Sequence, residues 1–207
     1  MTDAQFEAGP DSIIQPGAIV GLAYKPDAGP AILGARAVVR TGAIIYGDVT
    51  VGDDFQTGHQ VLMREHTSAG RHVLLGTQSV IDGNVTIGDF VKIESMVYIP
   101  THVTIGSYVF IGPGVVMTND RYPLKLRDEY APIGPTLEDG VTVGGGVTIV
   151  PGVKIGRDSF IAAGAVVTKD MPSDSLVIGA PARAEPLPAK LRERNMARSW
   201  ARALEGQ

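Results

Sequence analysis

Polar side chains, several of which could move protons, recur every 18 residues through the middle of the chain. The series comprises Asp48, His66, Asn84, His102 and Asp120, and a neighbouring series comprises Glu65, Gly83, Thr101 and Asn119. An imidazole titrates near neutral pH and can act as a general base, and a carboxylate can receive a proton. Polar residues are also the ordinary surface residues of a repeat protein, and we favour that interpretation for Asp48, His66 and Asn84.

Small residues and cations gather toward the C-terminal end of the chain. The small residues are Gly144, Gly145, Gly146, Ala162, Ala163 and Gly164, and the cations are Lys169 and Arg183. Small side chains would let a thin ligand arm lie against exposed strand backbone, and a backbone N–H in the glycine run could stabilise an oxyanion. The two cations could then meet phosphate groups. The alternative is that the small residues fill tight positions and the cations are solvated.

A six-residue aliphatic period predicts the elements that position these residues. Stepping by six from Leu33 to Met117, 13 of 15 positions carry a large aliphatic residue or Met, which excludes chance agreement. A second run, in a new phase, extends from Leu137 to Val167. This period fits neither an amphipathic helix nor an alternating strand, but it fits short strands joined by tight corners. Three strands would make one coil, and coils stack about 4.8 Å apart, so residues 18 apart should lie above one another.

Two segments interrupt the repeat. Residues 119–136 lie between the two runs, hold three prolines and mixed charges, and are predicted to form a loop pushed out of the coil. The Gly- and Pro-rich residues 21–31 predict an earlier excursion. The repeat domain is predicted to span residues 1–186. Residues 187–207 predict a C-terminal helix and tail that cap the open end, because large apolar residues recur there at near-helical spacing.

An aliphatic residue followed by Gly, as in VTIGDF, VTIGSY and VKIGRD, resembles the repeat of the hexapeptide-repeat acyltransferases. The period does not define handedness, and the resemblance implies an all-β, left-handed parallel β-helix, against the usual crossover preference. The stretch IAAGAVVTKDMPSDSLVIGAPAR, residues 161–183, is similar to the acetyl-CoA-binding end of that family. The resemblance therefore implies acetyl-CoA as the acyl donor and a homotrimer with sites between subunits. The implied cofactor-binding residues are Gly145, Gly146, Ala162, Ala163, Lys169 and Arg183.

The motif MTNDRYP, residues 117–123, resembles a narrower group, the N-acetyltransferases that modify amino groups on nucleotide-linked sugars. This resemblance covers roughly residues 85–183 and implies a role in surface-polysaccharide or glycoconjugate biosynthesis. It implies Asn119, Asp120 and His102 as catalytic residues and Thr101, Asn84 and Tyr122 as substrate-binding residues. Some members of the group carry an acidic residue where this chain has Thr101, and His102 sits beside that position.

The chemistry expected at such a site depends on the acceptor. A sugar amine with a pKa of roughly 8 is partly neutral at pH 7 and needs orientation more than a strong base. Asn119 and Asp120 would align it and receive its proton, with His102 as a further general base. A hydroxyl acceptor would require His102 as the base, so a sugar O-acetyltransferase is the first alternative.

Two further classes of function are weighed against acyl transfer. The γ-class carbonic anhydrases share the fold and bind zinc through His, and this chain has four His residues. His66 and His102 would lie two coils apart, about 9.6 Å, which is too far to share zinc within one chain. We therefore expect no metal. The last alternative is a non-enzymatic scaffold with an unused cleft.

Composition limits the remaining classes. The formal net charge of −4 argues against non-specific nucleic-acid binding, which needs clustered Lys and Arg. The chain has no Cys, which excludes disulfides and a thiol nucleophile. It has no run of 18 apolar residues and no basic, apolar leader at its start, so we expect a cytoplasmic protein without a membrane span.

Overall fold

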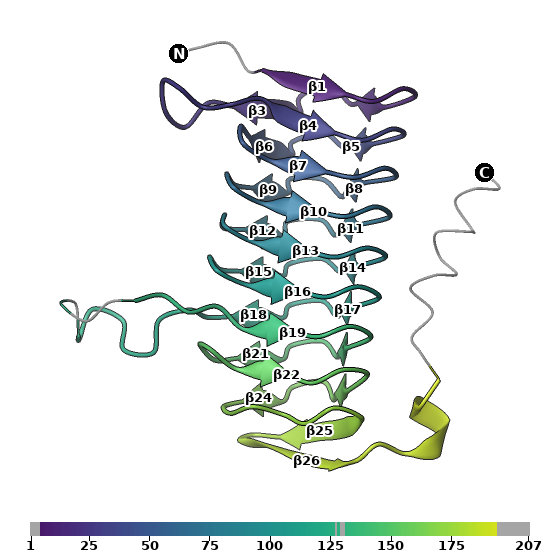
Figure 1. The fold of residues 1–207 in the computed structure, drawn as a ribbon, viewed down its shortest axis with the longest axis vertical. Helices are drawn as coiled ribbons and strands as arrows, with labels where there is room; N and C mark the ends of the chain where they lie inside the picture. Colours follow the sequence, from purple (N-terminus) through teal and green to yellow (C-terminus); the bar gives the residue numbers. More distant parts are fainter. Residues whose placement is uncertain (1–4, 127, 129–130, 194–207) are drawn as a thin grey trace.

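The computed structural model describes residues 5–126, 128 and 131–193, and these wind as a left-handed parallel β-helix (Figure 1). In Figure 1 the front strands run from left to right, and the chain returns behind them as it descends, which is left-handed winding. The strands form three sheets, here called A, B and C, and each coil visits them in that order. The prediction of an all-β, left-handed β-helix is confirmed.

The strands are short, and most contain two residues. Sheet A contains β1 (Phe6–Ala8), β4 (Ala31–Leu33), β7 (Thr50–Val51), β10 (Ser68–Ala69), β13 (Thr86–Ile87), β16 (Thr104–Ile105), β19 (Thr136–Leu137) and β22 (Lys154–Ile155). Sheet B contains β2 (Ile13–Ile14), β5 (Val38–Val39), β8 (Gln56–Thr57), β11 (Leu74–Leu75), β14 (Lys92–Ile93), β17 (Phe110–Ile111), β20 (Thr142–Val143), β23 (Phe160–Ile161), β25 (Ser175–Gly179) and β26 (Ala182–Pro186). Sheet C contains β3 (Ile19–Leu22), β6 (Ile44–Tyr46), β9 (Leu62–Met63), β12 (Val80–Ile81), β15 (Tyr98–Ile99), β18 (Val116–Met117), β21 (Thr148–Ile149) and β24 (Val166–Val167).

The six-residue period defines the core. From β5 onward the second residue of each two-residue strand points inward and is buried, as Ile81, Ile93 and Ile99 are, whereas Ile14 of β2, near the open end, is partly buried. Thr57 and Ala69, the two exceptions to the aliphatic period, occupy the same inward position and are also buried. The Thr57 hydroxyl oxygen accepts a hydrogen bond from the backbone N–H of Arg40 at 2.9 Å, so this buried polar atom is satisfied.

The sheets meet at three corners, here called A/B, B/C and C/A after the sheets that each corner joins. At the C/A corner Asp48, His66, Asn84 and His102 all have positive φ, between 50° and 66°. The backbone N–H of His66 donates to the carbonyl of Asp48, and the N–H of His102 donates to the carbonyl of Asn84. These four residues therefore form the predicted column.

Both predicted excursions leave the helix at the C/A corner, one between β3 and β4 and the other between β18 and β19 (Figure 1). The length of the second excursion follows from the pairing register of the strands in sheet A. Thr86 pairs with Thr104, an offset of 18 residues, whereas Thr104 pairs with Thr136, an offset of 32. Fourteen residues, 120–133, are therefore inserted into this coil.

Asp120, the predicted last member of the column, does not join it. A Cβ added at Gly134 would meet the backbone of His102, so Gly134 is the residue that lies on His102. The prediction that Asp120 stacks there is wrong, because the insertion begins at Asp120 and the chain regains the corner only at its end.

The C-terminal end of the described chain closes the helix. β25 continues sheet B, and β26 folds back against it as an antiparallel strand that ends at Pro186. A 3₁₀ turn, Ala189–Leu191, follows. The predicted C-terminal helix falls mainly on residues 194–207, which lie outside the described residues, and it stays a prediction. In the part of the chain that the structure describes, no helix is long and apolar enough to cross a membrane.

Candidate active site

The B/C corner carries only Gly, Ala and Pro at its exposed positions in the last three coils. Its residues there are Pro113, Gly114, Gly145, Gly146, Ala163 and Gly164, which we call the bare corner. The three coils are held in register by hydrogen bonds of 2.9 Å from Gly146 N–H to the Pro113 carbonyl and from Gly164 N–H to the Gly145 carbonyl. A Cβ added at Gly114, Gly146 or Gly164 would meet no described atom within 4 Å.

The backbone does not require glycine at these positions. Gly114, Gly146 and Gly164 have φ values of 68°, 66° and 72°. Gln78 and Met96 occupy the same corner in the two coils before that of Gly114, and they adopt φ values of 60° and 62° with full side chains. Neither backbone conformation nor neighbouring atoms explain the change to glycine, so the change clears the surface outside the corner.

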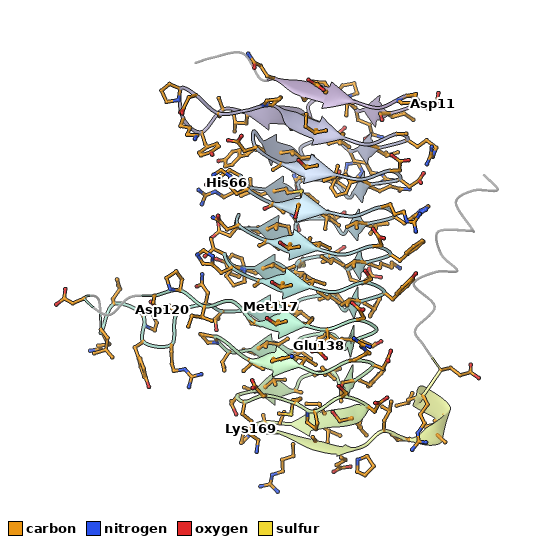
Figure 2. All side chains as sticks on the ribbon, viewed as in Figure 1. Asp11, His66, Met117, Asp120, Glu138 and Lys169 are labelled. Atoms are coloured by element: carbon orange, nitrogen blue, oxygen red, sulfur yellow. The ribbon has the colours of Figure 1, made fainter. Side chains whose placement is uncertain are left out.

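The predicted cofactor residues fall on two corners. Ala162 donates its N–H to Val177 at 2.8 Å, and Ile178, the next residue of β25, pairs with Arg183 of β26. The exposed Arg183 therefore lies in space beside the C-terminal end of the bare corner. Lys169 comes after β24 and lies at the C/A corner instead, along the same edge as His66 and Asp120 (Figure 2). A single chain does not bring Lys169 together with the other predicted cofactor residues.

Asn119 is held at the C/A corner by contacts with Thr101 in the preceding coil. Its side-chain Nδ2 lies 2.8 Å from the hydroxyl oxygen of Thr101 and 3.4 Å from the Thr101 carbonyl oxygen. Its own carbonyl accepts a hydrogen bond from the N–H of Ile133, where the excursion returns. Asn119 is half-buried and therefore joins the mouth of the loop to the stacked coil.

Asp120 and Arg121 fix the start of the excursion. One carboxylate oxygen of Asp120 accepts a hydrogen bond from the backbone N–H of Tyr122 at 2.9 Å. The Arg121 guanidinium donates to the Pro151 carbonyl at 3.2 Å and ties the excursion to the next coil. The Tyr122 side chain is 56% exposed and points away from the packed coil. One of the two carboxylate oxygens of Asp120 thus contributes to loop structure.

His102 lies next to Thr101 with its side chain exposed. Asn84 is the exposed residue at the same place in the preceding coil, and its carbonyl accepts a hydrogen bond from the N–H of His102 at 3.1 Å. The structure therefore brings Asn84, Thr101, His102 and Asn119 together on one edge. This edge carries a hydrogen-bonding amide and an imidazole that is exposed to solvent.

Sequence reasoning missed a cluster at the other excursion. The Tyr24 hydroxyl donates to Asp48 at 2.8 Å and lies 2.9 Å from Nε2 of His66. Partial burial and the Asp48 carboxylate raise the pKa of Tyr24 to about 12, and the Tyr24 hydrogen bond lowers the pKa of Asp48. The Gly29 N–H also donates to Asp48, so the cluster fastens the first excursion to the column. Among the described side chains, no group of three His, Asp or Glu could hold a metal ion.

The bare corner and the Asn119 edge belong to different corners of one chain, separated by sheet C. Three parallel sheets of short strands, with one inward residue in every six, define a β-helix of hexapeptide repeats. Residues 84–119 and 134–169 match the family described as bacterial transferase hexapeptide (six repeats). The match stops where the insertion begins and resumes where it ends. These two stretches make up about a third of the chain and are similar to the repeat of that family.

Individual relatives are similar over short stretches. A galactoside O-acetyltransferase of Lactococcus lactis is 47% identical over 45 residues, 22% of this chain and 22% of the relative. A 2,3,4,5-tetrahydropyridine-2,6-dicarboxylate N-acetyltransferase of Staphylococcus aureus is 43% identical over 47 residues, 23% of this chain and 20% of the relative. The chain spans about a third or less of the length of the curated relatives it matches.

A solved structure supports the fold. It comes from Bacillus cereus, is titled as a candidate acetyltransferase, and is similar with a TM-score of 0.51 at 20% identity. The similarity covers 92% of this chain and 95% of the other. At this identity the likeness extends to the architecture of the β-helix.

Proposed function

We propose that this protein is an acetyl-CoA-dependent N-acetyltransferase that acts on the amino group of a nucleotide-linked amino sugar. The observation that carries the proposal is the bare corner, whose glycines replace full side chains where neither the backbone nor the packing demands it. A pantetheine arm is thin and could lie along this cleared strip. Arg183 at its end supplies a cation for the CoA phosphates.

The proposal requires more than one copy of the chain, because the donor strip and the acceptor edge lie on either side of sheet C. The outward side chains of sheet C are mostly apolar, namely Ile19, Ile44, Leu62, Val80, Tyr98, Val116 and Val166, with Thr148 as a polar exception. The outward residues of sheet A are mostly polar, namely Thr50, Ser68, Thr86, Thr104, Thr136 and Lys154, with Ile32 as an apolar exception. An apolar sheet face of this length favours contact with other copies.

A trimer with sheet C facing the three-fold axis places the B/C corner of each copy beside the C/A corner of the next. Each such junction would then combine the bare corner of one copy with the Asn119 edge of its neighbour. Lys169, which lies at the C/A corner, would also reach the CoA of the adjacent copy. This arrangement unites residues that a single chain keeps apart.

In the proposed reaction the amine nitrogen attacks the thioester carbonyl carbon. The C–N bond forms, the C–S bond breaks, the amine gives up one proton and the CoA sulfur gains one. Asn119 would orient the amine, and His102 or the second oxygen of Asp120 would take the proton. Gly144 and Gly146 already donate their N–H groups within the helix, whereas the N–H of Gly145 has no partner within residues 5–126, 128 and 131–193. The Gly145 N–H is therefore the donor we assign to the oxyanion.

The test is release of free CoA thiol from acetyl-CoA with a panel of nucleotide-linked amino sugars and the corresponding hydroxy sugars. The proposal predicts thiol release with at least one amino sugar and formation of its N-acetyl product. Release with the hydroxy sugars alone would replace it with O-acetylation, which the similarity to a galactoside O-acetyltransferase favours as the second candidate. No release with any acceptor would overturn acetyl transfer to sugars.

A further inference from the structure

We infer that Thr101 is a positioning residue that locks the Asn119 amide with its oxygen toward the acceptor. The inference deepens the proposed function and rests on it. A side-chain amide presents either an N–H₂ donor or a C=O acceptor, and which end faces the substrate decides what it can recognise. Two contacts from Thr101 decide this orientation.

The Thr101 hydroxyl alone would not distinguish the two ends of the amide, because a hydroxyl both donates and accepts. The Thr101 carbonyl oxygen, 3.4 Å from the amide, can only accept. The end of Asn119 that faces Thr101 must therefore be Nδ2, which donates to the hydroxyl oxygen at 2.8 Å. The side-chain carbonyl oxygen of Asn119, Oδ1, then points away from the preceding coil, which carries Thr101.

An outward amide oxygen accepts a hydrogen bond but takes no proton at neutral pH. A neutral primary amine has two N–H donors and one lone pair, so it can donate to Asn119 and still direct its lone pair at the thioester. Thr101 is well suited to hold this geometry because it is half-buried and a β-branched side chain has restricted χ1 freedom.

The experiment compares Thr101→Val, which keeps the shape and loses the hydroxyl, with Thr101→Ser, which keeps the hydroxyl. Both are combined with Asn119→Ala in a double-mutant cycle, and kcat and KM are measured for acceptor and for acetyl-CoA. We expect Thr101→Val to lower kcat about three- to tenfold, the value of one neutral hydrogen bond, and to leave the KM for acetyl-CoA unchanged. Thr101→Ser should restore kcat to within about twofold, and Thr101→Val should cost nothing further once Asn119 is Ala.

Thr104→Val is the matched control, because Thr104 is an exposed sheet A residue in the next strand. It should behave as the wild type does. If Thr101→Val does not fold, Thr101→Ala takes its place in the cycle. Unchanged kcat in Thr101→Val, or losses that add to those of Asn119→Ala, would overturn the inference while the wild-type activity stands. Absence of transfer by the wild type would overturn the proposed function and this inference together.

Discussion

Gly114 and Asn119 lie in the same coil of the β-helix, at opposite edges of sheet C, with β18 between them. In a trimer whose axis runs parallel to the helix, residues in the same coil of neighbouring copies lie at the same height. The donor strip at Gly114 and the amide of Asn119 would therefore meet at one level between two copies. The following predictions test the parts of that account.

Replacing Ala163 with Trp should abolish CoA binding and leave the helix folded. Ala163 is exposed in the bare corner, and an indole there would fill the cleared strip. Calorimetric titration with CoA measures the effect. His59→Trp is the matched control, because His59 is exposed at the same corner several coils away, and it should bind CoA as the wild type does. Unchanged affinity in a folded Ala163→Trp variant would remove the bare corner from the site.

The relative loss of activity in Asn119→Ala and His102→Ala should identify the acceptor. With an amine acceptor, Asn119→Ala should lose more activity, and His102→Ala should lose less than about tenfold near pH 8, because part of the amine is already neutral. The deficit of His102→Ala should grow as the pH falls. Kinetics over the range of pH 6 to pH 9 measure both variants. A loss of about a thousandfold for His102→Ala at every pH would indicate a hydroxyl acceptor.

Tyr24 should contribute stability that disappears at high pH. Its pKa is raised from 10.0 to about 12, so the folded state holds the phenol proton more tightly than the unfolded state does. The contribution is fully present below pH 10 and is lost as the pH rises through about 12. The difference in free energy of unfolding between the wild type and Tyr24→Phe should therefore stay constant up to about pH 9 and shrink above pH 10. A difference that stays constant up to pH 12 would contradict this assignment.

The fold could be predicted from the sequence because one inward residue in every six must be buried. Even Thr57 and Ala69 keep the inward position, since the strands on either side fix their register. The rule that residues one coil apart lie above one another fails at Asp120. It holds only within uninterrupted coils, and the insertion starts at that residue. The sequence motif predicts that Lys169 lies with Ala163. Lys169 is six residues further along the chain, however, and therefore lies at the next corner.

Three side-chain arrangements could not be predicted from the sequence. Tyr24 lies in an excursion that the period does not describe, so nothing in the spacing could bring it to Asp48 and His66. The contact between Asn119 and Thr101 follows from their offset of one coil, but the orientation of the amide depends on side-chain positions. The absence of neighbours around Gly114 in the described structure likewise has no signature in composition.

Subunit complementation tests the central claim most directly. Ala163→Trp keeps an intact Asn119, and Asn119→Ala keeps an intact bare corner, so each variant alone should be inactive or nearly so. If the site is shared between copies, equal mixing by unfolding and refolding should restore about a quarter of the wild-type activity, since about a quarter of the junctions then combine two intact halves. Native mass spectrometry verifies that mixed trimers form. Mixed trimers with no more activity than the two variants measured separately would contradict the account.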